Sequence, residues 1–480
     1  MSKTKCWQTQ HYPHLFGMWQ DWISQSHWQP VDLWLKHWQR RNPYSPRETS
    51  NRGNYRKPRS PAHTRKTGSA INQDQLREER LLLSEALFVA MRYLQLASAL
   101  ECAFQTSLNN PDATKTIDWQ KWDEHWTPQT AYKIGADKLW YWFGLRIQYN
   151  CPPPPSLADA HRRQQWLMEE QKHFSDSSNL DIWLIWHGLR PQWASYLVER
   201  KELSNWDDRD RLKFVREQNS FPPLWLRAQK GAQDAELATK LREEGVLIAT
   251  ASGLSASGGK GIQETTAYKS GLVEIQDLAS QQIAMAVNAQ PGDKVWDTCA
   301  GAGGKSLAIA SRMGNKGVIV ATDLHEYKLT ELKRRAKRAD ISTIRTFPWD
   351  GQAPLRLPKE IARQQGFDWV LIDAPCSASG TWRRNPDARW RFFPQECEPL
   401  IQLQAQLLSQ AEPAVREGGH LVYATCSWLA EENEHQVDCF LQRHPGFHLI
   451  YQKLLGLPAE DSDTMFVAVL RKHIDGPPTA

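Results

Sequence analysis

The chain has 480 residues, a net charge of +5 at neutral pH, 24% charged residues and 40% hydrophobic residues. This length exceeds one ordinary hydrophobic core and predicts two to four domains. No apolar run is long enough to cross a bilayer and no signal-peptide pattern opens the sequence, so we expect a cytoplasmic protein without a membrane partner. The mild basic excess is compatible with nucleic acid but does not establish it as a partner.

The 8 cysteines include no Cys-x-x-Cys pair and no cluster with zinc-ligand spacing. They therefore predict no metal site, and their ordinary interpretation is small buried thiols in a reducing compartment. The chain also holds 23 tryptophans. Tryptophan can stack on nucleobases, but most tryptophans in folded chains are core residues, so core packing is expected for any one of them.

The N-terminal half divides into two parts by composition. Residues 1–70 form a Trp-rich and basic extension, in which the tryptophans between Leu15 and Trp38 recur at roughly helical spacing and a linker rich in Arg, Pro, Ser and Asn follows. The linker charge either contacts RNA phosphates or is simply solvated. Residues 71–215 have helical periodicity and predict a helical domain of unknown role.

A small α/β subdomain is predicted for residues 216–265. A strand follows two prolines at 222–223, an amphipathic helix ends at Gly245, and a second strand begins at Val246. The Gly- and Ser-rich stretch 253–261 is expected to be a loop.

Residues 266–475 alternate between apolar strand-like runs and helical stretches. The runs begin near residues 295, 317, 344, 367, 418, 447 and 465, and only the last two have no helix between them. This alternation predicts a parallel sheet with helices on both faces and one antiparallel strand in a C-terminal hairpin. The predicted fold class is α/β: a Rossmann-like, seven-stranded sheet of the methyltransferase type, preceded by the small α/β subdomain and the helical domain.

The first of these runs leads into a Gly-rich loop, DTCAGAGGKS, at residues 297–306. Such a loop between a strand and a helix lets the backbone approach a ligand. A Walker A loop would need glycine at 299, and a dinucleotide fingerprint would need glycine at 306, but Cys299 and Ser306 stand there. The remaining interpretation is an S-adenosylmethionine loop, which Asp297 and the glycines at 301, 303 and 304 fit.

Acidic residues follow the next three strands. Asp323 ends the second, where a carboxylate can accept both ribose hydroxyls of a cofactor; Asp350 follows the third, where it can receive an adenine amino group; Asp373 ends the fourth. One aspartate after a strand is usually a cap or turn residue. Three at one edge of a sheet, beside a Gly-rich loop, predict contacts with a cofactor.

Two cysteines also follow strands: Cys376 in DAPCSASG and Cys426 in YATCS. We expect both at the edge where the cofactor lies. Cytosine C5 is a poor nucleophile, and a thiolate that adds to C6 activates it, while Asp373 can hydrogen-bond or protonate N3. The target base must be extruded or already single-stranded to reach such a site. These residues therefore predict methylation of cytosine C5 through a covalent adduct.

The strand and loop motifs carry a resemblance that covers residues 219–472. The sequence resembles the NOP/Sun family of RNA cytosine-C5 methyltransferases, nearest to the bacterial 16S rRNA enzymes of the RsmB type, in GLVEIQDLAS, DTCAGAGGKS, DAPCSASGTWRRNPD, YATCS and FVAVL. The resemblance implies that Cys426 is the nucleophile and that Cys376 assists product release. It implies S-adenosylmethionine as cofactor, held by Cys299, Ala300, Gly301, Ala302, Gly303, Gly304, Lys305, Asp323, Asp350 and Asp373.

RNA is the predicted partner, rRNA rather than tRNA, and the chain is expected to be a monomer. Arg383 and Arg384 are candidates for RNA phosphate contacts, with surface salt bridges as the alternative. A tRNA cytosine-C5 methyltransferase and a non-catalytic RNA-binding or ribosome-assembly factor on the same scaffold stay open. A DNA cytosine-C5 methyltransferase is disfavoured, because its nucleophile is the cysteine after proline and Cys426 would not be expected. The sequence names neither the RNA nor the cytosine.

Overall fold

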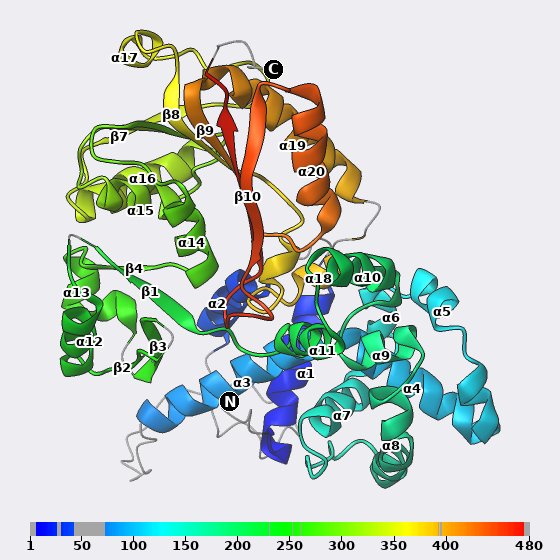
Figure 1. The fold of residues 1–480 in the computed structure, drawn as a ribbon. Helices are drawn as coiled ribbons and strands as arrows, with labels where there is room; N and C mark the ends of the chain where they lie inside the picture. The colour runs from blue at the N-terminus through cyan, green and yellow to red at the C-terminus, as the bar shows by residue number, and fades with distance from the viewer. Residues whose placement is uncertain are drawn as a thin grey trace, which may run out of the picture. The chain divides into compact units, whose positions relative to one another are not determined.

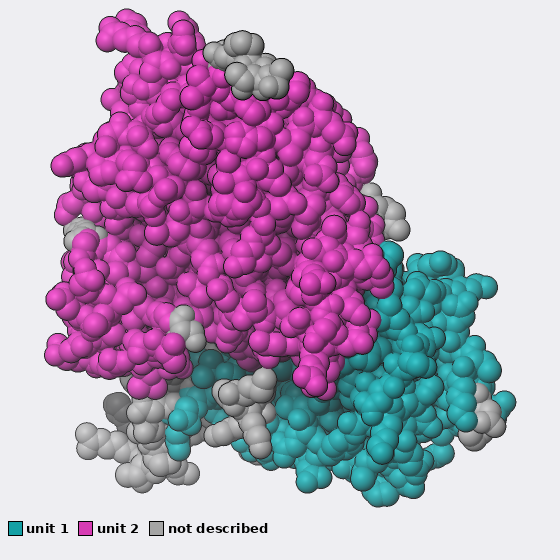
Figure 2. All heavy atoms as spheres, viewed as in Figure 1, with its two compact units in different colours: residues 1–195, 385–391 teal, residues 196–384, 392–480 magenta. Residues whose placement is uncertain are grey.

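The computed structural model describes residues 6–25, 30–42, 73–229, 231–251, 253–259, 261–391, 393 and 396–474. Most of the predicted basic linker lies outside these residues. The chain divides into two compact units (Figure 2): residues 1–195 with 385–391, and residues 196–384 with 392–480. All of the predicted site residues belong to the second unit, which is described after the first.

The first unit is helical and its core is rich in indole rings. Trp7, Trp19, Trp22 and Trp140 are buried, and the rings of Trp7 and Trp140 meet edge to face at 5.2 Å. The core interpretation is therefore confirmed for these tryptophans. The helices are α1 (Tyr12–Ile23), α2 (Val31–Arg41), α3 (Gln73–Arg92), α4 (Leu94–Asn109), α5 (Trp119–His125), α6 (Pro128–Tyr132), α7 (Ala136–Ile147), α8 (Ala160–Ser175) and α9 (Leu180–Trp186).

The predicted N-terminal extension packs into this same core, since α1 and α2 share one hydrophobic cluster with α3, α4 and α7. Cys6 and Cys151 form a disulfide. The expectation that the cysteines are buried free thiols is therefore wrong for this pair, whose separation of 145 residues hides it from a spacing rule. Disulfides are rare in reducing compartments, so the bond also weakens the sequence argument for a cytoplasmic location, which stays a prediction.

None of the described helices alone is long and apolar enough to cross a bilayer. Among the described helices, only the consecutive segments Glu78–Arg92 and Leu94–Asn109 together reach the length and apolar character of a membrane span. They are bent by 65° at their junction.

A short segment from the C-terminal half returns to the helical unit. Residues 385–391 include α18 (Ala388–Arg391), in which Trp390 is buried. Its indole N–H donates to the carbonyl of Met91, and its ring lies 5.5 Å from that of Trp126. Arg389 donates to the carbonyl of Gly188 at 2.8 Å. Each domain predicted from the sequence is one continuous segment, so the prediction does not place residues 385–391 in the helical unit.

The second unit opens with α10 (Ala194–Leu203) and α11 (Asp208–Glu217), followed by a small sheet in the order β2-β3-β1-β4. All three strand pairs are antiparallel. The prediction of a loop at 253–261 is wrong, because residues 255–259 form β3. The small side chains of β3 carry no apolar pattern that would predict a strand. The strand is instead supported by pairing with a neighbouring strand on each of its edges. The elements are β1 (Leu224–Ala228), α12 (Asp234–Glu243), β2 (Val246–Ala249), β3 (Ser255–Gly259), α13 (Thr266–Lys269) and β4 (Val273–Ile275).

The large sheet confirms the predicted fold class. Its seven strands run in the order β10-β11-β9-β8-β5-β6-β7 (Figure 1), and β11 alone is antiparallel to both of its neighbours. The pairs among β5 to β9 are parallel. The strands are β5 (Lys294–Asp297), β6 (Val318–Asp323), β7 (Ile344–Pro348), β8 (Phe367–Asp373), β9 (Val415–Thr425), β10 (Phe447–Leu455) and β11 (Met465–Lys472).

Helices cover both faces of this sheet (Figure 1). One face carries α14 (Leu278–Ala286), α15 (Gly304–Arg312) and α16 (Glu326–Arg338), and the other carries α17 (Lys359–Ala362), α19 (Cys397–Ala411) and α20 (Glu434–Arg443). Successive residues of one strand enter opposite layers: Val295 packs with Ile309, and Trp296 packs in the layer of Leu407. The strands β5, β6, β8 and β11 are mostly buried, which explains their continuous apolar runs, whereas the edge strands β7 and β10 are largely exposed.

The end of β5 carries a carboxyl group that is fully buried, that of Asp297. One oxygen accepts a hydrogen bond from the Ser306 hydroxyl at 2.5 Å, and the other has no partner among the described residues. Burial raises the pKa of Asp297 to about 7, although the bond from Ser306 lowers it.

Replacement of Trp390 by alanine should lower the free energy of unfolding by about 3–5 kcal/mol, because a large buried side chain is lost and the cavity persists. Chemical denaturation followed by circular dichroism measures this change. Met168→Ala in α8, where the side chain is 65% exposed, is the control and should change the free energy by less than about 0.5 kcal/mol. Equal effects of the two changes would contradict the assigned core.

Asp297 should make the protein less stable as the pH rises. Its pKa is about 7 in the native state against an ordinary value of 3.8, so between these values the native state binds more protons and each rise in pH favours unfolding. Between pH 5 and pH 8 the free energy of unfolding should therefore fall by roughly 3 kcal/mol less in Asp297→Asn than in wild type. Denaturant titrations at both pH values compare the variant with wild type, and equal pH slopes would refute the assignment.

Candidate active site

The Gly-rich loop joins β5 to α15 at the carboxyl edge of the large sheet. Gly303 has φ +83°, and a Cβ there would lie 2.5 Å from Leu332 Cγ, so this position requires glycine. Gly301 has φ +54°, but a Cβ there would meet nothing within 4 Å. The loop backbone is therefore open beside Gly301, as the approach of a ligand requires.

Other predicted loop residues have structural partners. The Ala300 amide donates to the carbonyl of Thr322 at 2.8 Å, and the Ala302 carbonyl accepts from Arg335 at 2.7 Å. A Cβ on Gly304 would approach only Gln276, at 3.8 Å. Burial raises the pKa of the Cys299 thiol to about 12, so this sulfur is uncharged and unreactive at neutral pH.

Asp323 is tied directly to the loop. Its carboxylate is buried and accepts hydrogen bonds from the amides of Gly301 and His325, both at 2.9 Å. Asp350 follows β7, is exposed, and accepts from the amide of Gln352 at 3.0 Å. The structure thus brings Asp323 to the loop and places Asp350 in a turn; their cofactor contacts stay predictions.

Asp373 ends β8 and pairs with Lys305 at the start of α15. The Lys305 ammonium lies 2.6 Å from a carboxylate oxygen of Asp373. Burial alone would lower the pKa of Lys305, but Asp373 outweighs it and raises this pKa, with a smaller contribution from Cys426. The lysine is therefore a fixed positive charge close to Cys426.

The two predicted catalytic cysteines meet at this edge. The Sγ atoms of Cys376 and Cys426 are 3.3 Å apart and both residues are half-buried. The contact with Cys426 and then burial raise the pKa of Cys376 well above its ordinary value, and the charge of Glu432 adds to the effect. Cys376 is therefore a neutral thiol at neutral pH, suited to hydrogen-bonding or donating a proton rather than to attack.

Arg383 and Arg384 have partners within the protein. Arg383 is 1% exposed and donates to Asp461 and to the Ser220 hydroxyl, both at 2.7 Å. Arg384 bridges Asp277 and Asp463, each at 3.0 Å. These contacts favour the salt-bridge alternative, but the expected surface position is wrong for Arg383, which is buried; RNA contacts by either arginine stay predictions.

Sequence reasoning missed the buried polar residues that surround the cysteine loops. They are Ser377, Ser379, Gln404, Ser427, Glu432 and Asn433, and all are buried. The signal that was available is the acidic and amide run EENE at 431–434, which follows YATCS after the three residues 428–430. Among the described residues no group of three or more His, Cys, Asp or Glu side chains could hold a metal ion.

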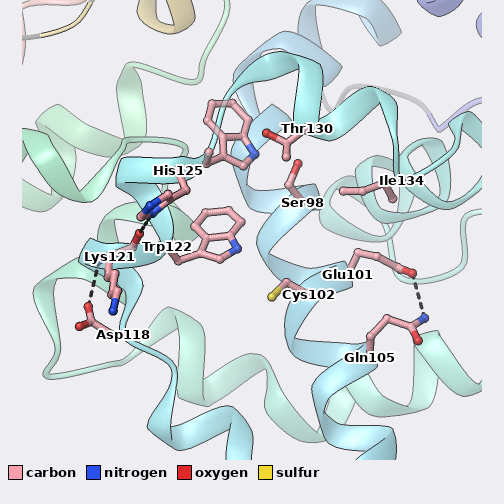
Figure 3. Close-up of a pocket in the computed structure, with 11 residues that line it drawn as sticks. Ser98, Glu101, Cys102, Gln105, Asp118, Lys121, Trp122, His125, Thr130 and Ile134 are labelled. Atoms are coloured by element: carbon pink, nitrogen blue, oxygen red, sulfur yellow. Dashed lines mark hydrogen bonds between the residues drawn. The ribbon is translucent and has the colours of Figure 1, made fainter.

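A separate cavity of about 560 Å³ lies within the helical unit (Figure 3). Cys102 and Glu101 on α4 border it from one side and Trp122 on α5 from the other. None of the predicted site residues lines this cavity, so it is distinct from the edge described above.

Comparison with known proteins gives consistent matches. The family model for the 16S rRNA methyltransferase RsmB/F matches residues 284–471. Ribosomal RNA small subunit methyltransferase B of Photorhabdus laumondii is 32% identical over 295 residues, 60% of this chain and 63% of the relative. The protein of that name from an Enterobacter species is 30% identical over 336 residues, 66% of this chain and 72% of the relative.

Among solved structures, the crystal structure of PH0851 matches with a TM-score of 0.58 at 23% identity, covering 84% of this chain and 95% of that one; this likeness shows the fold. The chain spans 63% of the length of the Photorhabdus relative. The family match takes in the Gly-rich loop and both cysteines. With 72% of the Enterobacter relative covered at 30% identity, the chain belongs to the S-adenosylmethionine-dependent NOP/Sun methyltransferase family, in its RsmB/F branch.

Proposed function

We propose that this protein methylates C5 of a cytosine in RNA, with S-adenosylmethionine as methyl donor and Cys426 as covalent nucleophile. The observation that carries the proposal is the 3.3 Å approach of the Cys376 and Cys426 sulfurs beside the ion pair of Lys305 and Asp373. The names of the relatives, ribosomal RNA small subunit methyltransferase B, support small-subunit rRNA as the substrate rather than tRNA.

The cofactor fits the Gly-rich loop, since the backbone is open beside Gly301 and the buried carboxylate of Asp323 adjoins it. Asp323 would accept the ribose hydroxyls and Asp350 the adenine amino group. Bound there, S-adenosylmethionine supplies an electrophilic methyl group. The residues proposed to hold it are Cys299, Ala300, Gly301, Ala302, Gly303, Gly304, Lys305, Asp323, Asp350 and Asp373.

The first task of the chain's own residues is to activate cytosine. The ammonium of Lys305 lies near Cys426, and addition of the Cys426 sulfur to C6 makes C5 electron-rich. Asp373, held at 2.6 Å by Lys305 and 29% exposed, can reach an incoming base and stabilise the charge that develops at N3.

The second task is product release. Once C5 carries the methyl group, the C5 proton passes to a water molecule, the C5–C6 double bond reforms and the C6–S bond breaks to expel the Cys426 thiolate. The neutral thiol of Cys376 can hydrogen-bond the departing thiolate, because the two sulfurs are already in contact. The two cysteines therefore act at opposite ends of one catalytic cycle.

Cys376→Ala should accumulate a protein–RNA adduct, while Cys426→Ala and the double variant should trap no RNA and transfer no methyl group. The variants are incubated with unmodified total RNA and labelled cofactor and then analysed on denaturing gels. Trapping by Cys426→Ala alone would exchange the two roles. No adduct in any variant and no transfer by wild type would favour the RNA-binding factor.

Bisulfite sequencing of RNA from a deletion strain then identifies the cytosine.

Asp373→Asn should slow methyl transfer in a single turnover by about 10²–10⁴-fold, because an amide neither pairs with Lys305 nor shares a proton with N3. The matched control is Asp368→Asn on the same strand, where the carboxylate instead binds Arg416 at 2.7 Å. The control should keep the wild-type rate, and an equal loss in both variants would argue against a catalytic role for Asp373.

A further inference from the structure

Two adjacent residues behind the cysteines hydrogen-bond to different cysteine loops. Glu432 ends a 3₁₀ turn at 430–432 and Asn433 follows it; both side chains are fully buried. A buried carboxylate is costly unless donors surround it. The identity of those donors therefore indicates what the carboxylate holds in place.

Glu432 holds the loop of Cys376. One carboxylate oxygen accepts from the Ser377 amide at 2.8 Å, and the other accepts from the Ser377 hydroxyl at 2.6 Å. Gln404 of α19 donates to the first oxygen at 3.1 Å. Because Ser377 is the residue after Cys376, these bonds fix the backbone on which that thiol is carried.

Asn433 holds the loop of Cys426. Its side-chain oxygen accepts from the Thr425 hydroxyl at 2.5 Å, and its side-chain nitrogen donates to the Ser427 carbonyl at 3.0 Å. Thr425 and Ser427 flank Cys426 on both sides. The side-chain amide of Asn433 thus binds the residue before Cys426 through its oxygen and the residue after Cys426 through its nitrogen.

The two loops are also joined to each other. The Ser427 hydroxyl lies 3.2 Å from that of Ser377 and 2.9 Å from that of Ser379. The Gly380 amide donates to the carbonyl of Cys426 itself at 2.9 Å. These bonds set the spacing between the two loops, while Glu432 and Asn433 each hold one loop from behind.

We infer that Glu432 and Asn433 are positioning residues that divide the two cysteine loops between them, Glu432 placing Cys376 for product release and Asn433 placing Cys426 for attack. The assignment of steps rests on the proposed function. The placement itself rests on the contacts to Ser377, Thr425 and Ser427. A carboxylate suits the first task, since it accepts three bonds at once, whereas the amide of glutamine would turn its own N–H toward one of the donors.

The placement is tested first without RNA. Diamide oxidises adjacent thiols to a disulfide, and peptide mass spectrometry measures the initial rate at which Cys376 joins Cys426 in the full-length protein. Glu432→Gln and Asn433→Ala should each slow this rate about 10-fold, as expected when a buried hydrogen bond is lost and the loop moves. The control is Glu431→Gln, in the same turn, whose half-buried carboxyl faces Glu199 and His435 and should leave the rate unchanged.

The division of steps is tested with unmodified RNA and cofactor. Glu432→Gln should slow disappearance of the protein–RNA adduct about 10-fold while its formation stays near wild type, and Asn433→Ala should do the reverse. Ser377→Ala and Thr425→Val remove one contact from each network and should reproduce the two patterns if a first variant fails to fold. A purely structural role would slow both steps together.

The outcomes separate the two proposals. Unchanged cross-linking, or equal effects of both variants on both steps, overturns the positioning roles. Slower cross-linking in both variants together with the divided kinetics supports them. Slower cross-linking, together with no adduct in any variant and no methyl transfer by wild type, supports the placement of the thiols by Glu432 and Asn433 and instead refutes the proposed function.

Discussion

The parallel pairing of β8 with β9 is the constraint on which the candidate active site depends. Asp373 lies opposite Ala424 in this pair, so the chain leaves both strands at the same edge. Cys376 and Cys426 follow within three residues, and their sulfurs meet at 3.3 Å. A slip of one residue would turn every side chain of one strand to the opposite face and separate the sulfurs. The hydrophobic layers on both faces of the sheet therefore also set the geometry of the cysteines.

Burial gives chemically identical cysteines different properties at this edge. Cys299 lies in the Gly-rich loop among the carboxylates of Asp297, Asp373 and Asp323, and its thiol is held uncharged. Cys376 is held uncharged by its contact with Cys426 and by burial. Cys426 interacts with the ammonium of Lys305, which Asp373 fixes in place. The candidate nucleophile is therefore distinguished by its neighbours.

The sequence predicted the large sheet well because strands buried on both faces read as continuous apolar runs. The same rule failed for β3 (Ser255–Gly259), whose residues have no apolar signal and are held by two neighbouring strands. The disulfide between Cys6 and Cys151 was also not predicted, because the approach of two cysteines 145 residues apart depends on how the helices pack. Arg383 is a third case, because its partner Asp461 comes from a distant loop and the pair is invisible to spacing.

The residues of the candidate site also differ in whether the sequence alone predicts them. Cysteines and aspartates that follow strands are recognisable from the sequence because topology alone brings strand ends together. Glu432 and Asn433 are not, since acidic and amide residues in a turn are ordinarily solvated. Their burial requires Ser377, Gln404 and Thr425 to be in place already, because an unpaired carboxylate would not be tolerated there. The cysteine loops and the residues behind them are therefore mutually dependent, and only the folded chain reveals the second set.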